Sequence, residues 1–326
     1  MTRSSRQEQG DRGLRGSTHI APRFFHHLRS FIAALAVALG AVALPRTAAH
    51  ASTVPARPPQ PVDTLLFCNQ PERLQAPGAY ADAVLTGGKT YRIFFHYRNT
   101  AGATKPLVVA FQGSVGKKLV LDIRKGIADP QNDPPLAGRQ AMARYLKAPN
   151  QRFVGDGGAR FPMKLRSWDV ASGIITVKAD QDVRLRIYFQ HNKQVVTNAR
   201  VVAVKAPHRE VKIALSEESM RQYYRIGSPE EGMTGGMDGA YGLVYTFQVE
   251  APVGRTVRVT FSPRGGHSGL VAALNGLLFQ SPIVGAQGLS VFAEAKAGPD
   301  GLALVTVPFG GVFYPVEVAF HLLSEK

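Results

Sequence analysis

Short segments in which apolar and polar side chains alternate constrain this sequence most strongly, because they recur from about residue 62 to its end. Residues 90–97 are the clearest example. The alternation puts two sets of side chains on opposite faces: Tyr91, Ile93, Phe95 and Tyr97 on one, and Arg92, Phe94, His96 and Arg98 on the other. A period of two is typical of a β-strand that packs one face on a core. We interpret the second face as the polar one, with His96 a solvated or cross-strand residue rather than a ligand.

Two groups of such segments follow one another along the chain. The first includes 107–111, 118–123, 174–177, 183–189 and 201–204, and the second includes 241–249, 255–261, 288–294, 302–307 and 316–322. Between them lies 207–237, where strand signals are weak. We predict an all-β fold of two tandem β-sandwich domains, 62–206 and 207–326. One short helix is expected in the first domain, at 136–147, because Leu136, Met142 and Leu146 lie near helical spacing.

The first 51 residues predict export. A basic stretch that ends in Arg23 and Arg29 runs into the apolar segment 31–44, and small residues up to Ala51 follow. This order is typical of a signal peptide, and 14 apolar residues are fewer than the roughly 20 that a membrane-spanning helix needs. We expect cleavage after Ala51, an extracytoplasmic protein, secreted or in the cell envelope, and no transmembrane anchor after cleavage. An uncleaved signal anchor is the alternative. The proline-rich segment 52–61 is expected to be a solvated linker.

Positive charge is concentrated in the N-terminal half. After removal of residues 1–51 the chain keeps 32 basic and 21 acidic residues, and segment 83–168 alone holds 15 Lys or Arg against 4 Asp or Glu. Two cationic pairs, Lys117 with Lys118 and Arg124 with Lys125, bracket one predicted strand and are expected on the rims of its sheet. They are our candidate binding residues for an anionic cell-wall or extracellular polymer. Solubility alone is the alternative explanation of the charge, and nothing indicates specific nucleic-acid recognition.

Metal and disulfide chemistry have little support. The only cysteine, Cys68, cannot close an internal disulfide, and we predict a buried thiol in a strand, with intermolecular pairing as the alternative. The five histidines beyond residue 51 are far apart in sequence, so we predict no metal site and no cofactor. A site assembled in space from His267, Asp238 and a glutamate such as Glu231 stays open.

Segments that resemble catalytic motifs lack essential residues. Segment 111–118 is similar to a phosphate-binding loop, but Phe111 replaces its first glycine and Lys118 replaces its Ser or Thr, so we interpret it as a hairpin turn. Segment 266–269 is similar to a nucleophile elbow around Ser268, but Leu270 stands where glycine is required. The glutamate pairs 217–218 and 230–231 are adjacent in sequence, whereas glycosidase carboxylates face each other across a cleft. We assign no catalytic residue.

Several short motifs are shared with known sequences. They are Gly239-Ala240-Tyr241-Gly242-Leu243-Val244-Tyr245, Phe261-Ser262-Pro263-Arg264-Gly265-Gly266, Val307-Pro308-Phe309-Gly310-Gly311, Phe94-Phe95-His96-Tyr97-Arg98-Asn99-Thr100 and Ala171-Ser172-Gly173-Ile174. With them the chain resembles an uncharacterised family of secreted bacterial β-domain proteins, often found beside the small stalk domain named after copper amine oxidases. The resemblance implies an envelope location and β domains, and it implies no catalytic or ligand residue.

Two function classes remain after these exclusions. The first is a secreted, non-catalytic bacterial cell-envelope module that adheres to an anionic polymer through its basic N-terminal domain. The second is an extracytoplasmic hydrolase with an unrecognised site near Asp238 and His267. A concave pocket with converging carboxylates would favour the hydrolase.

Overall fold

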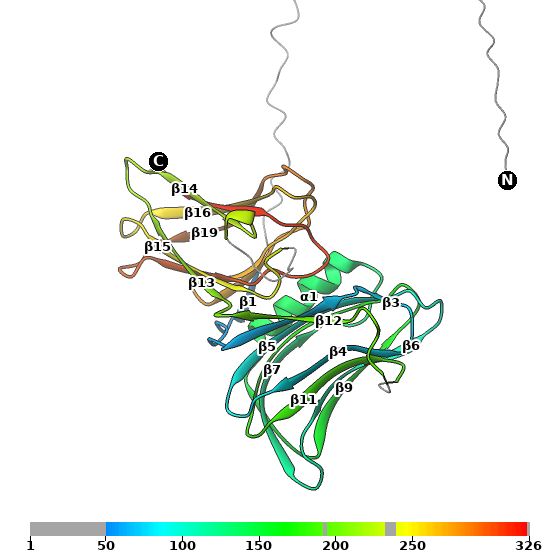
Figure 1. The fold of residues 1–326 in the computed structure, drawn as a ribbon. Helices are drawn as coiled ribbons and strands as arrows, with labels where there is room; N and C mark the ends of the chain where they lie inside the picture. Colours follow the sequence, from blue (N-terminus) through cyan, green and yellow to red (C-terminus); the bar gives the residue numbers. More distant parts are fainter. Residues whose placement is uncertain (1–49, 192–193, 232–238, 325–326) are drawn as a thin grey trace, which may run out of the picture. The chain divides into compact units, whose positions relative to one another are not determined.

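Strands dominate the computed structural model, which describes residues 50–191, 194–231 and 239–324 (Figure 1). These residues lie within one compact unit, Arg46–Lys326. Among them there is one α-helix, α1 (Pro134–Lys147), and one short 3₁₀ turn, η1 (Pro229–Glu231). The predicted all-β class with one short helix is confirmed, and the helix begins two residues before the predicted segment.

The first sandwich consists of two sheets. The one we call the covered sheet has the strand order β12 (Arg200–Lys205), β2 (Thr64–Gln70), β5 (Thr90–Asn99), β10 (Val170–Ala179), β7 (Lys118–Ile127) and β8 (Gln151–Asp156), with β3 (Arg73–Leu74) beside β5. The one we call the open sheet has the order β4 (Gly78–Leu85), β11 (Val183–Phe189), β6 (Lys105–Gln112) and β9 (Gly158–Leu165). Between the two sheets Ile93 and Phe95 of β5 pack with Val109, Phe111 and Leu185 of the open sheet. Every one of these side chains is completely buried.

The second sandwich is built in the same way. Its six-stranded sheet has the order β1 (His50–Pro55), β18 (Leu277–Gln280), β17 (Val271–Leu274), β20 (Leu302–Thr306), β15 (Val244–Glu250) and β13 (His208–Ala214). Its four-stranded sheet has the order β14 (Arg221–Ile226), β21 (Val316–Leu322), β16 (Thr256–Pro263) and β19 (Ser290–Lys296). The strands from β2 to β12 belong to the first sandwich, and those from β13 onward belong to the second. The chain therefore crosses between the sandwiches from Lys205 to His208, and β1 alone precedes the first sandwich in sequence while pairing in the second.

The second face of β5 is buried, so the expectation of a solvated His96 is wrong. Arg92 and His96 are 1% exposed and Phe94 is 2% exposed. Phe94 belongs to the same apolar cluster as Phe247 and Phe320 of the second sandwich. The alternation along β5 is correct, but a second layer covers the face that local sequence marks as polar.

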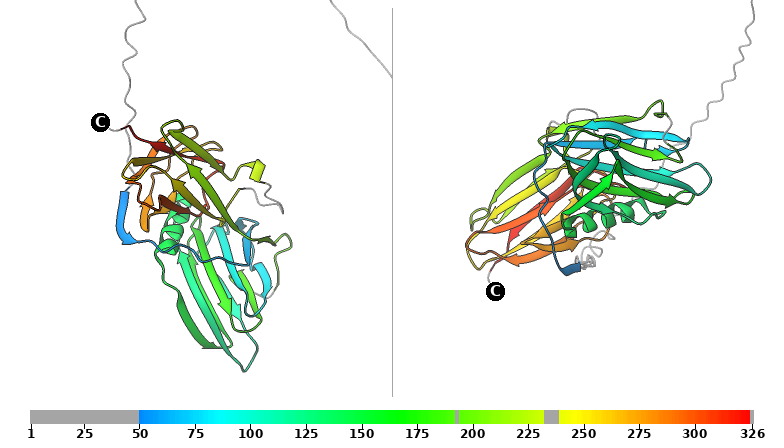
Figure 2. Two further views of the ribbon diagram at one scale, coloured as in Figure 1. Left: turned by 90° about the vertical axis from the view of Figure 1, so that its left-hand side faces the viewer. Right: turned by 90° about the horizontal axis from the view of Figure 1, so that it is seen from below.

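Helix α1 lies against the covered sheet (Figures 1 and 2). Asp133 begins it as an N-cap residue, because its Oδ1 accepts a hydrogen bond from Leu136 N at 2.9 Å. Gly126 of β7 permits the close approach, since a Cβ there would lie 2.1 Å from the carbonyl oxygen of Ala141. On its other side the helix packs against the second sandwich, where Met142 shares a cluster with Val271.

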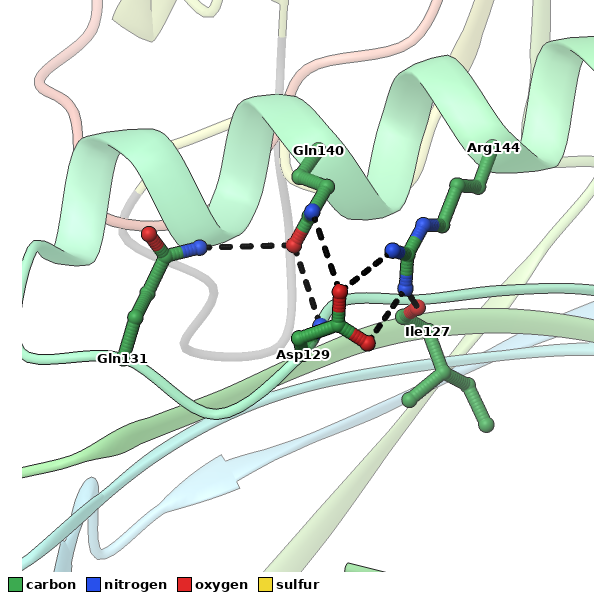
Figure 3. Close-up of polar contacts among 5 residues, drawn as sticks. All are labelled: Ile127, Asp129, Gln131, Gln140 and Arg144. Atoms are coloured by element: carbon green, nitrogen blue, oxygen red, sulfur yellow. Dashed lines mark hydrogen bonds and ion pairs between the residues drawn. The ribbon is translucent and has the colours of Figure 1, made fainter.

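An ion pair fastens the helix to the end of β7 (Figure 3). Arg144 donates to Ile127 O at 2.7 Å and pairs with Asp129, whose Oδ2 lies 2.5 Å from Arg144 Nη2. Gln140 accepts from the backbone N of Asp129 at 3.0 Å. These contacts are largely exposed and position the C-terminal half of the helix.

The segment expected to be a solvated linker is bound on both sides. Its first residues belong to β1, which pairs antiparallel with β18 from His50 opposite Gln280. The backbone of Ala56 donates to Gly276 O at 2.7 Å, and that of Arg57 donates to Leu146 O at 2.7 Å. An open sheet edge and the end of α1 therefore offer backbone partners to this segment, while Pro55, Arg57, Pro58, Gln60 and Pro61 stay exposed, and the assignment of 52–61 as a linker stays a prediction. Residues 1–49 lie outside the described ranges, so the signal peptide and its cleavage after Ala51 stay predictions.

The segment 207–237 contains two strands that the sequence does not indicate. β13 pairs in parallel with β15, and β14 pairs with β21. Both are edge strands that expose polar side chains at alternate positions, including Lys212, Arg221 and Arg225. Residues 232–238 lie outside the described ranges.

Candidate functional site

The four cations chosen from sequence do not form one surface. Lys117 lies in the turn that leads from β6 of the open sheet to β7 of the covered sheet, so the predicted hairpin is a connection between sheets. Lys118 begins β7, and both lysines are exposed. Arg124 and Lys125 are successive strand residues and leave β7 on opposite faces. Six residues of extended strand, about 20 Å, separate Lys118 from Arg124.

Arg124 is a structural residue, and its assignment to a sheet rim is wrong. The side chain is 4% exposed. It donates from Nε to Tyr145 O at 2.9 Å and from Nη1 to Pro58 O at 2.8 Å, and its Nη2 donates to Arg57 O. Its guanidinium also lies over the ring of Tyr145, 4.7 Å from the centroid. Burial lowers the pKa of Arg124 from its usual value. The residue joins the chain before β2 to the end of α1 and cannot bind a polymer.

Lys125 is only partly available. It is half-buried, and its ammonium lies 4.3 Å from the centroid of the Phe161 ring, a cation–π contact with the open sheet. Of the four predicted cations, Lys117 and Lys118 alone are exposed as expected.

A group of cations that sequence reasoning did not single out lies on the outer face of the open sheet. Arg160 and Lys164 come from β9, and Arg184 and Arg186 come from β11. Strand register aligns them: Arg160 lies opposite Ala110 of β6, which lies opposite Arg186. Two strand spacings, about 10 Å, therefore separate Arg160 from Arg186. We call this surface the open-sheet face. Most side chains between its cations are small or apolar, namely Pro106, Val108, Ala110 and Pro162, while Gln112 lies opposite Arg184 and Tyr188 lies on β11 beside Arg186.

One carboxylate lies among these cations. Asp82 of β4 accepts from Arg184 Nε at 2.7 Å and from Arg186 Nε at 2.9 Å. Burial alone would raise the pKa of Asp82, but the hydrogen bonds from both arginines lower it overall. No described acidic side chain pairs with Arg160 or Lys164, which are both exposed. Four cations against one carboxylate leave the open-sheet face with an excess of three positive charges.

A cavity of about 680 Å³ is the second candidate site. We call it the interface cavity, because it is bounded by the buried face of the covered sheet, the start of α1 and the loop that follows β20. Its polar lining includes Asn69, Gln70, Glu72, Arg73, His96, Arg98 and His267, and its aromatic lining is Phe67, Tyr241 and Phe313. Gly310 closes it over His96, since a Cβ at this glycine would lie 2.5 Å from the imidazole.

His96 is a buried, neutral group in this cavity. Burial, and to a lesser degree the charge of Arg98, lowers the pKa of His96 to about 3. No described residue hydrogen-bonds to either ring nitrogen, and neither does any to Asn69 Oδ1. An acidic group, Glu72, lies beside the imidazole, with its Oε1 4.0 Å from His96 Nε2. Burial raises the pKa of Glu72, opposed by the charges of Arg98 and Arg73.

The residues of the hydrolase alternative are only partly placed. His267 is exposed on the rim of the interface cavity, with its ring 4.9 Å edge-on from that of Phe313. Asp238 lies outside the described residues. Glu231 accepts from Tyr245 Oη at 2.6 Å, while Ser268 is buried and faces Val284 in an isolated bridge. In the part of the chain that the structure describes, no three His, Cys, Asp or Glu side chains lie close enough to hold a metal ion.

Cys68 is a completely buried thiol in β2, as predicted, and burial raises its pKa to about 12. Among the described residues, no helix is both long enough and apolar enough to span a bilayer.

Comparison with known proteins adds little. No family model matches the chain, and no curated protein matches it. One solved structure to which it was compared is the N-terminal CBM22-1-CBM22-2 tandem domain from Paenibacillus barcinonensis Xyn10C, at 10% identity over 85% of this chain and 93% of that chain. The TM-score is 0.14, so this likeness supports no argument about fold or function.

Proposed function

We propose that this protein is an exported, non-catalytic cell-envelope module that adheres to an anionic polymer through the open-sheet face of its N-terminal sandwich. The observation that carries the proposal is the excess of three positive charges on one uninterrupted strand surface. Export is supported by the order of basic, apolar and small residues before position 52.

The arrangement of the cations fits a chain-like ligand. Arg160 and Lys164 project from the same face of one strand, four residues and about 13 Å apart. A polymer with regularly spaced anionic groups can contact both at once, which raises its apparent affinity without a deep pocket. Because the cations are exposed, each contact is weak and screened by salt.

The test measures retention of residues 52–326 on immobilised polygalacturonate, with uncharged dextran as the neutral polymer. Retention should decline steeply from about 0.01 M to about 1 M salt, over which the Debye length falls from about 30 Å to about 3 Å. The double variant Arg160→Ser/Lys164→Ser should lose most of the retention. The matched variant Lys178→Ser/Lys212→Ser removes two exposed cations away from the open-sheet face and should keep it.

Equal loss in the two double variants would show that net charge, and not this face, is responsible. Retention that does not change with salt concentration would contradict an electrostatic mechanism. Release of soluble sugar from the polymer, abolished by His267→Ala, would contradict the non-catalytic assignment and favour the hydrolase alternative.

A further inference from the structure

Unpartnered polar groups deep in the interface cavity are the starting observation. His96 is 1% exposed and lines the cavity, yet none of the described residues bonds to its Nδ1 or Nε2. The Oδ1 atom of Asn69 in the same cavity is equally buried and unpartnered. A buried polar atom without a partner costs about 1–3 kcal/mol, and native proteins contain few of them. Three such atoms around one cavity need hydrogen-bond partners from a bound ligand or an ordered water.

The protonation state of His96 defines what this ligand must offer. A neutral imidazole has one N–H donor and one acceptor nitrogen, and Asn69 Oδ1 is an acceptor only. The ligand must therefore donate at least two hydrogen bonds and accept one. Hydroxyl groups do both, whereas sulfate and the dianion of a phosphate monoester have no proton to donate.

The rim of the cavity adds a preference for a carboxylate. Arg73 and Arg98 are register partners on the parallel strands β3 and β5, and both line the cavity. Together with Glu72 they leave one net positive charge at this edge. A guanidinium group can bind a carboxylate through two parallel N–H···O bonds, so either arginine can hold a carboxylate at this edge.

An aromatic wall completes the site. Tyr241 is fixed by a hydrogen bond from its Oη to Val312 O at 2.7 Å, and it stacks on Phe67 with 6.1 Å between centroids. Phe313 is 51% exposed at the mouth. The cavity volume of about 680 Å³ is within the range of about 300–1,000 Å³ that small-molecule sites occupy.

We propose that the interface cavity binds an acidic sugar unit. Its hydroxyl groups bond to His96 and Asn69, and its carboxylate pairs with Arg73 and Arg98. This inference rests on the proposed function for the choice of an acidic polysaccharide, but it concerns a different surface, and the ligand here is one or a few sugar units rather than an extended chain.

The experiment uses a trimer of galacturonic acid, too short to engage many cations at once, titrated into residues 52–326 by calorimetry. His96→Leu keeps the volume and removes both nitrogens, so it should weaken binding about ten-fold, the effect of about one lost hydrogen bond to a neutral group. The thermal unfolding midpoint of His96→Leu should equal or exceed that of the unmodified protein, because no described protein group loses a hydrogen-bond partner. Arg98→Met, at a half-exposed position, should weaken binding of the acidic trimer and not that of a galactose trimer.

The double variant Arg160→Ser/Lys164→Ser separates this site from the open-sheet face, and it should bind the trimer with unchanged affinity. No trimer binding by the unmodified protein, or full binding by both His96→Leu and Arg98→Met, would overturn the cavity assignment and leave polymer adhesion untouched. Loss of trimer binding in the open-sheet variant alone would overturn it too, and would move the sugar contact to that face. Equal competition by inorganic sulfate would contradict a sugar and indicate a simple anion site.

Discussion

The two outer faces of the first sandwich carry the same kind of side chain in opposite environments. On the covered sheet, Arg92 and Arg124 point outward from their strands but are buried beneath the second sandwich and α1. On the open sheet, Arg160 and Lys164 point outward into solvent. Arg92 and Arg124 donate hydrogen bonds to backbone carbonyl oxygens. Arg160 and Lys164 form no ion pair with a described acidic side chain. Positive charge in this half of the chain therefore has two separate roles, one in holding the sandwiches together and one in presenting a surface.

Buried arginines of this type differ from buried ion pairs. Neither Arg92 nor Arg124 has a carboxylate partner among the described residues, and each donates to carbonyl oxygens from several distant segments. Arg92 reaches Gln60 O at 3.1 Å and Gly242 O at 3.4 Å, and it links the chain before β2 to the second sandwich. Removing such a residue leaves several carbonyl groups without donors at once.

The largest expected effect is that of Arg92→Ala. We expect the free energy of unfolding to fall by about 3 kcal/mol, because the change opens a cavity and leaves buried carbonyls unsatisfied. Urea denaturation measures this. Arg92→Met restores volume without donors and should recover only part of the loss, while Arg160→Ala on the open sheet should stay within about 0.5 kcal/mol of the unmodified protein. Similar losses for Arg92→Ala and Arg160→Ala would remove the distinction between the two faces.

A smaller effect is expected from Arg124→Met. This change removes the donors to Pro58 and Tyr145 but keeps much of the packing on the Tyr145 ring, so we expect a loss of about 2 kcal/mol. Because Arg124 bonds the segment before β2, proteolysis between residues 52 and 63 should also become faster than in a Lys118→Met control. Unchanged proteolysis in Arg124→Met would mean that β1 and Ala56 hold this segment without the arginine.

Local sequence predicts strands where the alternation is strongest. Val183–Phe189 and Val316–Leu322 have the bounds expected from their apolar residues at every second position. β13 and β14 escape prediction because they are edge strands, whose exposed positions carry polar side chains in a segment without long apolar runs. The alternation along β5 puts Arg92, His96 and Arg98 on one face correctly. It contains no information on whether another layer covers that face.

The candidate sites were harder to predict than the strands for a related reason. The open-sheet face has a local signal, since Arg160 and Lys164 share a strand face, as do Arg184 and Arg186, but register with β6 is needed to bring the two pairs together. No pattern in the local sequence indicates the interface cavity. Asn69, His96 and His267 lie on segments up to about two hundred residues apart, and only the packing of the second sandwich on the covered sheet unites them.

The smallest expected effect concerns the exposed pair that holds α1 to the covered sheet. Hydrogen bonding to Arg144 lowers the pKa of Asp129 below its usual value. A carboxyl group whose pKa is lowered on folding contributes stability above its unfolded pKa, about 3.9, and this contribution is lost as pH falls through the folded value.

The side chains of Arg144 and Asp129 are 43% and 72% exposed, so solvent screens the pair, and Arg144→Met should cost no more than about 0.5 kcal/mol at neutral pH. Lys147→Met is the matched control, because it also removes a cation from the last turn of the helix. The difference between the two variants in urea denaturation should shrink as pH falls below about 4. A difference that persists at low pH would show that the bond from Arg144 to Ile127 O, and not the ion pair, fastens the helix.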